Sequence, residues 1–134
     1  MKKVYNIFIP AKGFRCLTVW PFIFVRLEEK RNYGERDEIH ESIHGKQQKE
    51  MLMCGAIIGI VMALHGLGWW SLAALPLFFW WYVAEWLVRL AVCRNAFKAY
   101  KAISFECEAF EHQDDPAYLD TRMPFAWLDY TIKN

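Results

Sequence analysis

The sequence predicts a mainly α-helical protein built on a two-span transmembrane helical hairpin, with a short β segment at its N-terminus. Of the 134 residues, 55% are hydrophobic and 17% aromatic, yet 23% are charged. The apolar residues must therefore be concentrated, and they fall between Met51 and Cys93. Within that block the ionisable side chains, cysteines and Tyr82 aside, are His65, Glu85 and Arg89. This length suits one domain, 1–134, with one core.

Residues 1–36 form the predicted strand and loop region. The stretch "LTVWPFIFVRL", residues 17–27, is rich in β-branched and aromatic residues and contains Pro21. Proline cannot donate to a central ladder, so this stretch is expected to be an edge strand or two short strands. A short apolar run near the start is broken by Pro10 and Lys12, which does not indicate a cleavable signal peptide.

Residues 37–65 are predicted to form one helix, with Asp37 as its N-cap, that continues into the first span. The second predicted span covers residues 71–93, and "GLGWW" supplies the turn between them. A span needs about 20 residues, so the first one is short. A buried helical hairpin in a soluble protein is the alternative interpretation.

The distribution of basic residues predicts the orientation and the location of the protein. Ten Lys and Arg residues precede Met51 and three lie between Arg94 and Lys101, whereas the connecting turn has none. Both termini are therefore expected in the cytoplasm, in a bacterial inner (cytoplasmic) membrane protein. A net charge of +1 argues against a nucleic-acid partner. Four cysteines without a metal-binding spacing fit a reducing compartment.

Residues 94–115 form the next predicted helix, with a possible restart at Ser104 as N-cap, and residues 116–134 form a tail. The aromatic side chains of the tail are expected to pack on the domain or on the membrane surface. Glu85 and Arg89, four residues apart, are interpreted as a structural ion pair that also meets Lys49 across the hairpin.

The motif "HESIH" places His40 and His44 on one face of a helix, with Glu41 beside the first. Two imidazoles on adjacent turns are typical ligands of a catalytic Zn²⁺, and a glutamate between them can serve as general base. In that mechanism Glu41 accepts a proton from water and later passes it to the leaving amine. A solvated helical turn with two aligned histidines is the plain alternative.

A third ligand is expected from "ISFECEAFEH", where four side chains are candidates: Glu106, Glu108, Glu111 and His112. Glu106 and Glu108 differ by about 200° of helix rotation, so only one of them can face the metal. Glu106 is favoured because it shares a face with the small Ala109, and Glu108 is the second choice. An unbroken second helix would carry Glu106 about 15 Å too far, so a bend is expected between Arg94 and Ser104.

This arrangement of HExxH, two spans and E-x-E-A resembles the integral-membrane gluzincin peptidases of the heat-shock and CAAX-processing type, and is similar to the antibiotic-sensor membrane peptidases. Their third zinc ligand is the first Glu of E-x-x-A-D, which implies Glu106 here, with Phe110 in the Asp position. The chain also resembles small membrane proteins of Bacteroides-type bacteria with "HE-x-I-H" and "I-x-F-E-x-E-A-[YF]". The resemblance implies a zincin-like site on the cytoplasmic side.

The leading hypothesis is a zinc metallopeptidase that cleaves a peptide or protein substrate at the lipid bilayer. Its alternatives are a non-catalytic membrane protein with a structural or regulatory zinc site, and a metal-free hairpin subunit of a larger assembly. An extended substrate is expected to add to an edge strand near Phe22–Val25. Gln47 and Gln48 follow the motif and are expected to be exposed helix residues, which are commoner than glutamines that face a substrate or support a ligand. Three side chains are possible oxyanion stabilisers, with none preferred: His112, Tyr118 and Arg122.

Overall fold

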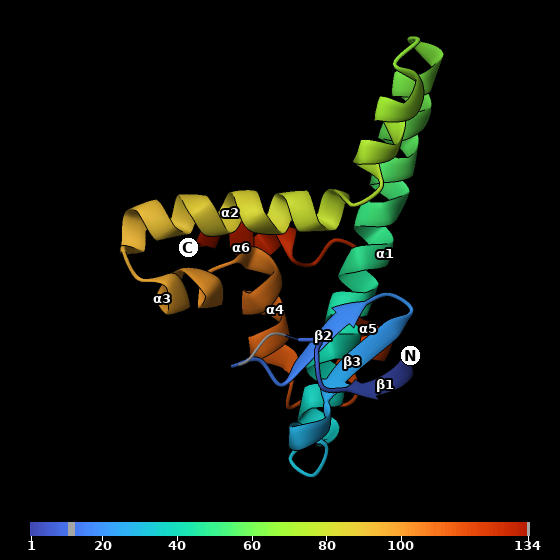
Figure 1. Cartoon of the computed structure of the whole chain (residues 1–134). Coiled ribbons are helices and arrows are strands. Elements are labelled where there is room, and N and C mark those ends of the chain that lie inside the picture. Colours follow the sequence, from blue (N-terminus) through green and yellow to red (C-terminus); the bar gives the residue numbers. More distant parts are fainter. Residues whose placement is uncertain (11–12, 134) are drawn as a thin grey trace.

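The computed structural model describes residues 1–10 and 13–133 and shows a mainly helical protein with a small N-terminal sheet (Figure 1). The strands are β1 (Lys2–Asn6), β2 (Cys16–Val19) and β3 (Phe22–Arg26). The helices are η1 (Leu27–Glu29), α1 (Glu35–Leu64), η2 (Gly68–Ala74), α2 (Leu77–Cys93), α3 (Ala96–Lys101), α4 (Ser104–His112), α5 (Tyr118–Thr121) and α6 (Leu128–Lys133), where η marks a 3-10 helix.

Helix α1 runs without a break from the histidine motif into the apolar block, as the sequence predicts. Its N-cap is Gly34, three residues before the expected Asp37. Asp37 still caps the helix, because its carboxylate accepts a hydrogen bond from the Gly34 N–H at 3.0 Å. An acidic side chain at the third helical position serves the same purpose as an N-cap, since it satisfies a backbone donor beside the positive end of the dipole.

The three strands pair in the order β1-β3-β2, with β1 parallel and β2 antiparallel to β3. Residues 17–27 thus give two strands, and Pro21 lies in the turn between them, where its missing N–H is harmless. The expectation of an edge strand near Phe22–Val25 is wrong. Those residues form the middle strand, whose backbone is paired on both sides, so a substrate strand cannot add there.

The second apolar segment, residues 71–93, is not the single helix that the sequence predicts. It divides at Leu75–Pro76 into η2 and α2, which meet at an angle of 63°. Pro76 has no N–H to continue the helix, and its own backbone leaves the helical region with ψ of 35°, which explains the break. Among the described residues, only α1 is by itself long and apolar enough to cross a membrane, and the bent pair would add one more if it counts as a span.

The predicted bend between Arg94 and Ser104 is confirmed, because α2, α3 and α4 are separate helices. Arg94 adopts a left-handed conformation with φ of 51° and ends α2. Ile103, rather than Ser104, is the N-cap of α4. Glu85 provides the cap instead, since it accepts hydrogen bonds from the Ser104 N–H at 3.0 Å and from its hydroxyl at 2.7 Å.

Glu85 also pairs with Arg89 at 3.2 Å, which confirms the predicted ion pair. The expected contact with Lys49 is absent from the contacts of the described residues, and the Lys49 ammonium instead lies 5.1 Å from the Trp20 ring centroid. Glu85 therefore links α2 to the start of α4.

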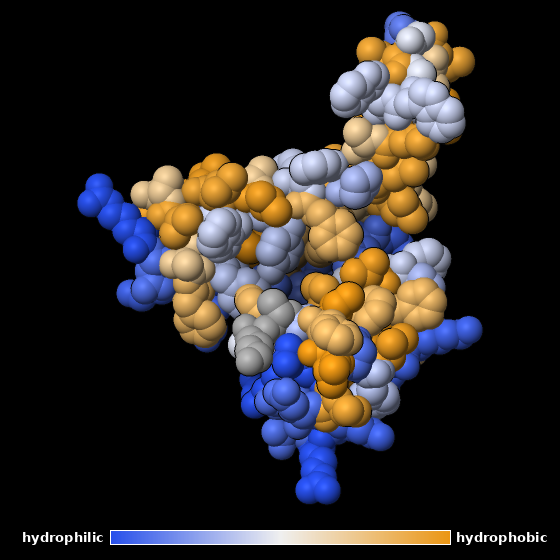
Figure 2. All heavy atoms as spheres, in the orientation of Figure 1, coloured by the Kyte–Doolittle hydropathy of each residue, from blue (hydrophilic) through white to orange (hydrophobic). Residues whose placement is uncertain are grey.

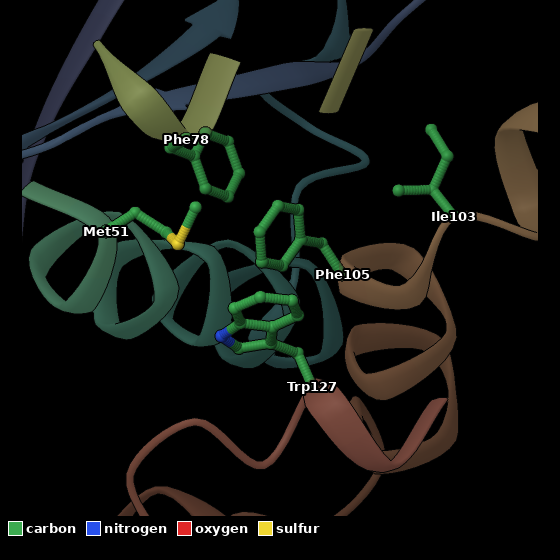
Figure 3. Packing of buried hydrophobic residues seen from close by; sticks show 5 residues of the cluster. All are labelled: Met51, Phe78, Ile103, Phe105 and Trp127. Atoms are coloured by element: carbon green, nitrogen blue, oxygen red, sulfur yellow. The ribbon is translucent and has the colours of Figure 1, made fainter. Parts of the chain in front are cut away.

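One cluster of buried side chains joins four helices: Met51 of α1, Phe78 of α2, Ile103 and Phe105 at the start of α4, and Trp127 before α6 (Figure 3). The ring centroids of Phe78 and Phe105 are 4.5 Å apart, and those of Phe105 and Trp127 are 4.6 Å apart. The tail thus packs on the domain, which was one of the two predictions for it. This cluster holds α4 against α1 and sets the position of Glu106.

Candidate metal centre

Three of the predicted site residues converge at the contact between α1 and α4. His40 and His44 project from successive turns of α1, and Glu106 projects from the first turn of α4. The two imidazole Nε2 atoms are 3.1 Å apart. Glu106 Oε1 lies 3.3 Å from His44 Nε2, and Oε2 lies 3.4 Å from His40 Nε2. All three side chains are buried.

With one ligand atom taken from each residue, the three atoms lie within 4.8 Å of one another, so the three side chains could hold a metal ion. Ligand atoms about 2.0–2.1 Å from a central ion, at tetrahedral angles, are about 3.3–3.4 Å from one another. Glu106 Oε2 is also buried and has no hydrogen-bond partner among the described residues. An unpartnered buried carboxylate oxygen is costly, and a cation between the three side chains would satisfy it. Two nitrogens and one carboxylate oxygen form a donor set that Zn²⁺ prefers.

Glu106 and Glu108 of α4 point to opposite sides, as the helical period requires. Glu106 meets the imidazoles, whereas Glu108 lies behind His44, fully buried in a polar network. His44 Nδ1 is 2.8 Å from Gln47 Oε1, and Gln47 Nε2 donates to Glu108 Oε2 at 3.0 Å. With Nδ1–H donated to Gln47, the Nε2 lone pair of His44 is directed toward the proposed metal position.

Arg122 closes this network from the C-terminal segment. Its guanidinium donates to both Glu108 and Glu50, with Nη2 3.2 Å and 3.3 Å from carboxylate oxygens of the two acids. Tyr118 also donates to Glu108, at 3.0 Å. Arg122 and Tyr118, considered as oxyanion stabilisers, therefore hold a buried acid instead. The third such residue, His112, stacks on Tyr118 with ring centroids 3.6 Å apart.

The two glutamines after the motif are buried, contrary to expectation. Gln47 orients His44, as described above. Gln48 lies against the free edge of β2, where its amide donates to the Thr18 carbonyl at 2.7 Å and accepts from the Trp20 N–H at 2.8 Å. Its amide therefore pairs with β2 much as another peptide unit would. The only sequence signal for the roles of Gln47 and Gln48 is their position one helical turn beyond His44.

Glu41 lies beside the imidazoles and is held by β2. Its Oε2 accepts a hydrogen bond from the Thr18 hydroxyl at 2.7 Å, and its Oε1 accepts one from the Cys16 thiol at 3.1 Å. Both donors lie in the strand that borders the site. The carboxylate is thus fixed in orientation, with one oxygen bound to the weak thiol donor, which leaves that oxygen the more available for another proton.

The electrostatics of the cluster are those of an anion between two imidazoles. Burial acts to lower the pKa of His44, but the adjacent Glu106 carboxylate outweighs it and raises the pKa to about 9. Burial acts to raise the pKa of Glu106, but the neighbouring imidazoles hold it well below its usual range. In the metal-free protein the site therefore keeps Glu106 ionised and His44 protonated at neutral pH.

A cavity of about 610 Å³ opens onto the cluster between α2 and β2. Most of its lining is apolar, with Phe78, Phe79, Val83 and Trp86 from α2, and its polar end is formed by the histidines, Glu41 and Glu106. A second, more polar cleft reaches His40 and Glu41 from the other side. All three residues of the cluster line the first cavity, so a ligand there has access to the proposed metal position.

Two tyrosines that sequence reasoning did not single out border the apolar cavity, and no motif marks either of them. The Tyr82 hydroxyl donates to Glu106 Oε1 at 2.8 Å, and Tyr100 lines the cavity nearby. Phe110, which stands in the Asp position of the resembled motif, packs its ring against His40 with centroids 4.8 Å apart. Gln47 and Glu108 supply polar support on the His44 side, while His40 is held by an aromatic contact.

Comparisons with family models, curated proteins and solved structures give no match to this chain.

Proposed function

We propose that this protein is a zinc-dependent membrane peptidase of minimal gluzincin type, in which His40, His44 and Glu106 hold the metal and Glu41 is the general base. The observation that carries the proposal is the convergence of three buried ligand atoms within 4.8 Å of one another, two of them from an HExxH motif. The resemblance to gluzincin sequences predicts the same three residues. Helix α4, sixty residues downstream, brings the third one into position.

A Zn²⁺ ion held there would polarise a substrate carbonyl and lower the pKa of a nearby water. The residues of the chain supply the remaining functions. Glu41 accepts the proton of the attacking water and returns it to the leaving amine, and Thr18 keeps its carboxylate in place. Gln47 fixes the ring of His44, and Tyr82 fixes Glu106. The apolar cavity excludes bulk water, which strengthens these electrostatic interactions.

The proposed setting is a bacterial inner membrane, with both termini cytoplasmic and a peptide or protein as substrate. Only 28% of the apolar window of α1 is buried within the protein. Exposed apolar side chains cover the upper part of α1, η2 and the outer side of α2, and a further apolar patch lies over the sheet, while charged residues gather at the lower end of the molecule (Figure 2). A surface divided in this way supports contact with a bilayer on one side and water on the other.

The metal and the base are tested separately. Purified protein should contain about one zinc per chain, and less than about 0.3 would reject the zinc site. Glu41→Gln should keep the zinc and abolish cleavage of a quenched fluorescent peptide library. Glu38→Gln is the matched control, because this exposed glutamate lies about one turn earlier in α1 and pairs with Lys3. Equal cleavage by Glu41→Gln and Glu38→Gln would remove Glu41 from the mechanism.

A non-catalytic protein with a structural zinc site is the second candidate. The observation in its favour is that both carboxylate oxygens of Glu41 already accept hydrogen bonds from β2. In that case the wild-type protein binds zinc but cleaves no peptide of the library, and removal of zinc by a chelator lowers its melting temperature. Cleavage by the wild type that is lost in Glu41→Gln decides for the peptidase.

A further inference from the structure

The C-terminal half of α1, residues 51–64, and η2 form a projection that stands apart from the rest of the protein, named here the stalk (Figure 1). Its surface is almost wholly apolar and outward-facing. The large side chains exposed by more than half are Met53, Ile57, Ile60, Leu64, Trp69, Trp70 and Leu72. Nothing in the described part of the chain covers them, so an apolar environment outside the protein must do so.

The two segments of the stalk are packed too closely to separate. A Cβ atom on Gly55 would lie 2.2 Å from the Ala74 carbonyl oxygen, and one on Gly59 would lie 2.9 Å from the Ser71 carbonyl oxygen. The spacing of the two glycines is the small-xxx-small pattern that allows backbones to approach within a membrane. The stalk is therefore one rigid unit whose return segment is η2.

The tip of the stalk satisfies much of its own backbone. The N–H groups of residues 65, 66 and 67 donate to carbonyls of α1 at 3.0–3.1 Å, and the Ser71 hydroxyl donates to the Gly68 carbonyl at 2.8 Å. Exposed polar backbone groups are excluded from the hydrocarbon core, where each costs several kcal/mol. A turn with these internal bonds is suited to a position inside lipid.

The stalk is shorter than a membrane. Met51 packs against Phe78 at the start of α2, so these residues mark its base. From there to Leu64 the helix rises about 20 Å, and η2 descends about 14 Å as a 3-10 helix. The hydrocarbon core is about 30 Å thick. A hairpin of this length ends within the bilayer if its base lies at the near surface.

Helix α2 indicates where that surface lies, because it begins beside α1, turns away from the stalk and extends to one side of α1 (Figure 1). One face of α2 is buried on the core through Phe78, and the other exposes Trp80, Val83 and Leu87. Arg94 and two lysines of α3 follow at its end. An apolar, Trp-bearing face with basic residues at one end is typical of a helix lying in the membrane interface.

We propose that the stalk enters the bilayer from the cytoplasmic side and returns without crossing it, while α2 lies flat in the interface. The protein is then held by a re-entrant hairpin rather than by two spans. The metal centre lies directly beneath α2, and the apolar cavity opens at the membrane surface. This inference rests on the proposed membrane location, but it is independent of zinc and of peptidase activity.

Single-cysteine labelling tests the inference in the full-length chain, with its four cysteines replaced by serine. The stalk variants are Trp69→Cys and Leu64→Cys, whose parent side chains are 87% and 82% exposed. The control is Arg36→Cys near the charged end of α1. A membrane-impermeant maleimide is added to spheroplasts, which present the outer surface, or to inverted vesicles, which present the cytoplasmic surface. Detergent-solubilised protein gives the total number of reactive thiols.

We expect Arg36→Cys to be labelled only in inverted vesicles, and both stalk variants to be labelled only after detergent is added. Labelling of Trp69→Cys in spheroplasts would show that the hairpin crosses the membrane and would overturn the proposal. Labelling in inverted vesicles without detergent would show that the stalk lies outside lipid, which also overturns it. Zinc content measured on the same samples reports separately on the proposed metal site.

Discussion

Arg122 provides the sharpest test of how the proposed metal centre is supported, although it contacts none of the three proposed ligands. Its side chain is 2% exposed and lies between the carboxylates of Glu50 and Glu108, both of them buried. Arg122→Met keeps most of the volume and removes the charge. Two buried carboxylates are then left without their cation, and Glu108 is the acid that holds Gln47 against His44.

Removal of one partner from a buried ion pair costs about 3–5 kcal/mol of folding free energy. Because two acids lose their partner here, we expect Arg122→Met to fall in the upper part of that range. The orientation of His44 should also loosen, and loss of such support typically lowers metal affinity by about 10–100-fold. The two effects have one cause and should appear together.

The free energy of unfolding is measured by denaturant titration in detergent micelles, and zinc affinity by competition with a chromophoric chelator. Arg36→Met is the matched control, since Arg36 pairs with Asp114 at 3.2 Å while both side chains remain more than 60% exposed. An exposed pair is worth at most about 1 kcal/mol. The additional changes Glu50→Gln and Glu108→Gln should restore most of the stability, because no buried charge remains. A loss in Arg122→Met no larger than in Arg36→Met would refute this reasoning.

Three further outcomes follow from the structure. The pKa of His44 is raised to about 9, so a Zn²⁺ ion that binds its imidazole below that pH must displace a proton. Zinc affinity should therefore fall about tenfold for each pH unit below pH 9, which is measured by zinc titrations at several pH values. Gly55→Ala should lower the free energy of unfolding by about 1–3 kcal/mol in the same denaturation assay, because its new Cβ atom would collide with the backbone of Ala74. Gly45→Ala is the control and should be nearly neutral, because its Cβ atom would meet only the flexible end of the Met1 side chain. Glu85→Ala should lower both the melting temperature and the zinc affinity, because the N–H and hydroxyl of Ser104 lose their acceptor. Glu85→Gln keeps an acceptor oxygen and should keep most of the melting temperature and of the zinc affinity. Equal losses in the two variants would contradict a capping role for Glu85.

The local features of the site were predictable from the sequence. The i and i+4 spacing of His40 and His44 places their side chains on one face of any α-helix, and the opposite orientations of Glu106 and Glu108 follow from the same period. The need for a bend before Ser104 followed from helix length, given a hairpin turn near residue 68 and Glu106 as the third ligand. These predictions succeeded because they depend on repeat geometry, which does not change with the surroundings.

The supporting residues could not be predicted in the same way. Gln47 and Gln48 resemble exposed helix residues in sequence, and Arg122 resembles a free cation in the tail. Their roles arise from packing, because α4, the C-terminal segment and β2 cover the side of α1 that would otherwise face water. Their partners lie between 14 and 72 positions away along the chain, and no local pattern encodes such contacts.

The amino-acid sequence is enough to predict the continuous helix α1, the position of two imidazoles and a carboxylate on it, and the division of the chain into apolar and charged parts. The three-dimensional fold is needed to bring Glu106 to those imidazoles and to turn α2 away from α1, at 63° to η2. The physical reason is that helix period and hydropathy are properties of a segment. The direction of α2 and the placement of α4 depend on the core around Phe105 and on the cap that Glu85 provides from another helix.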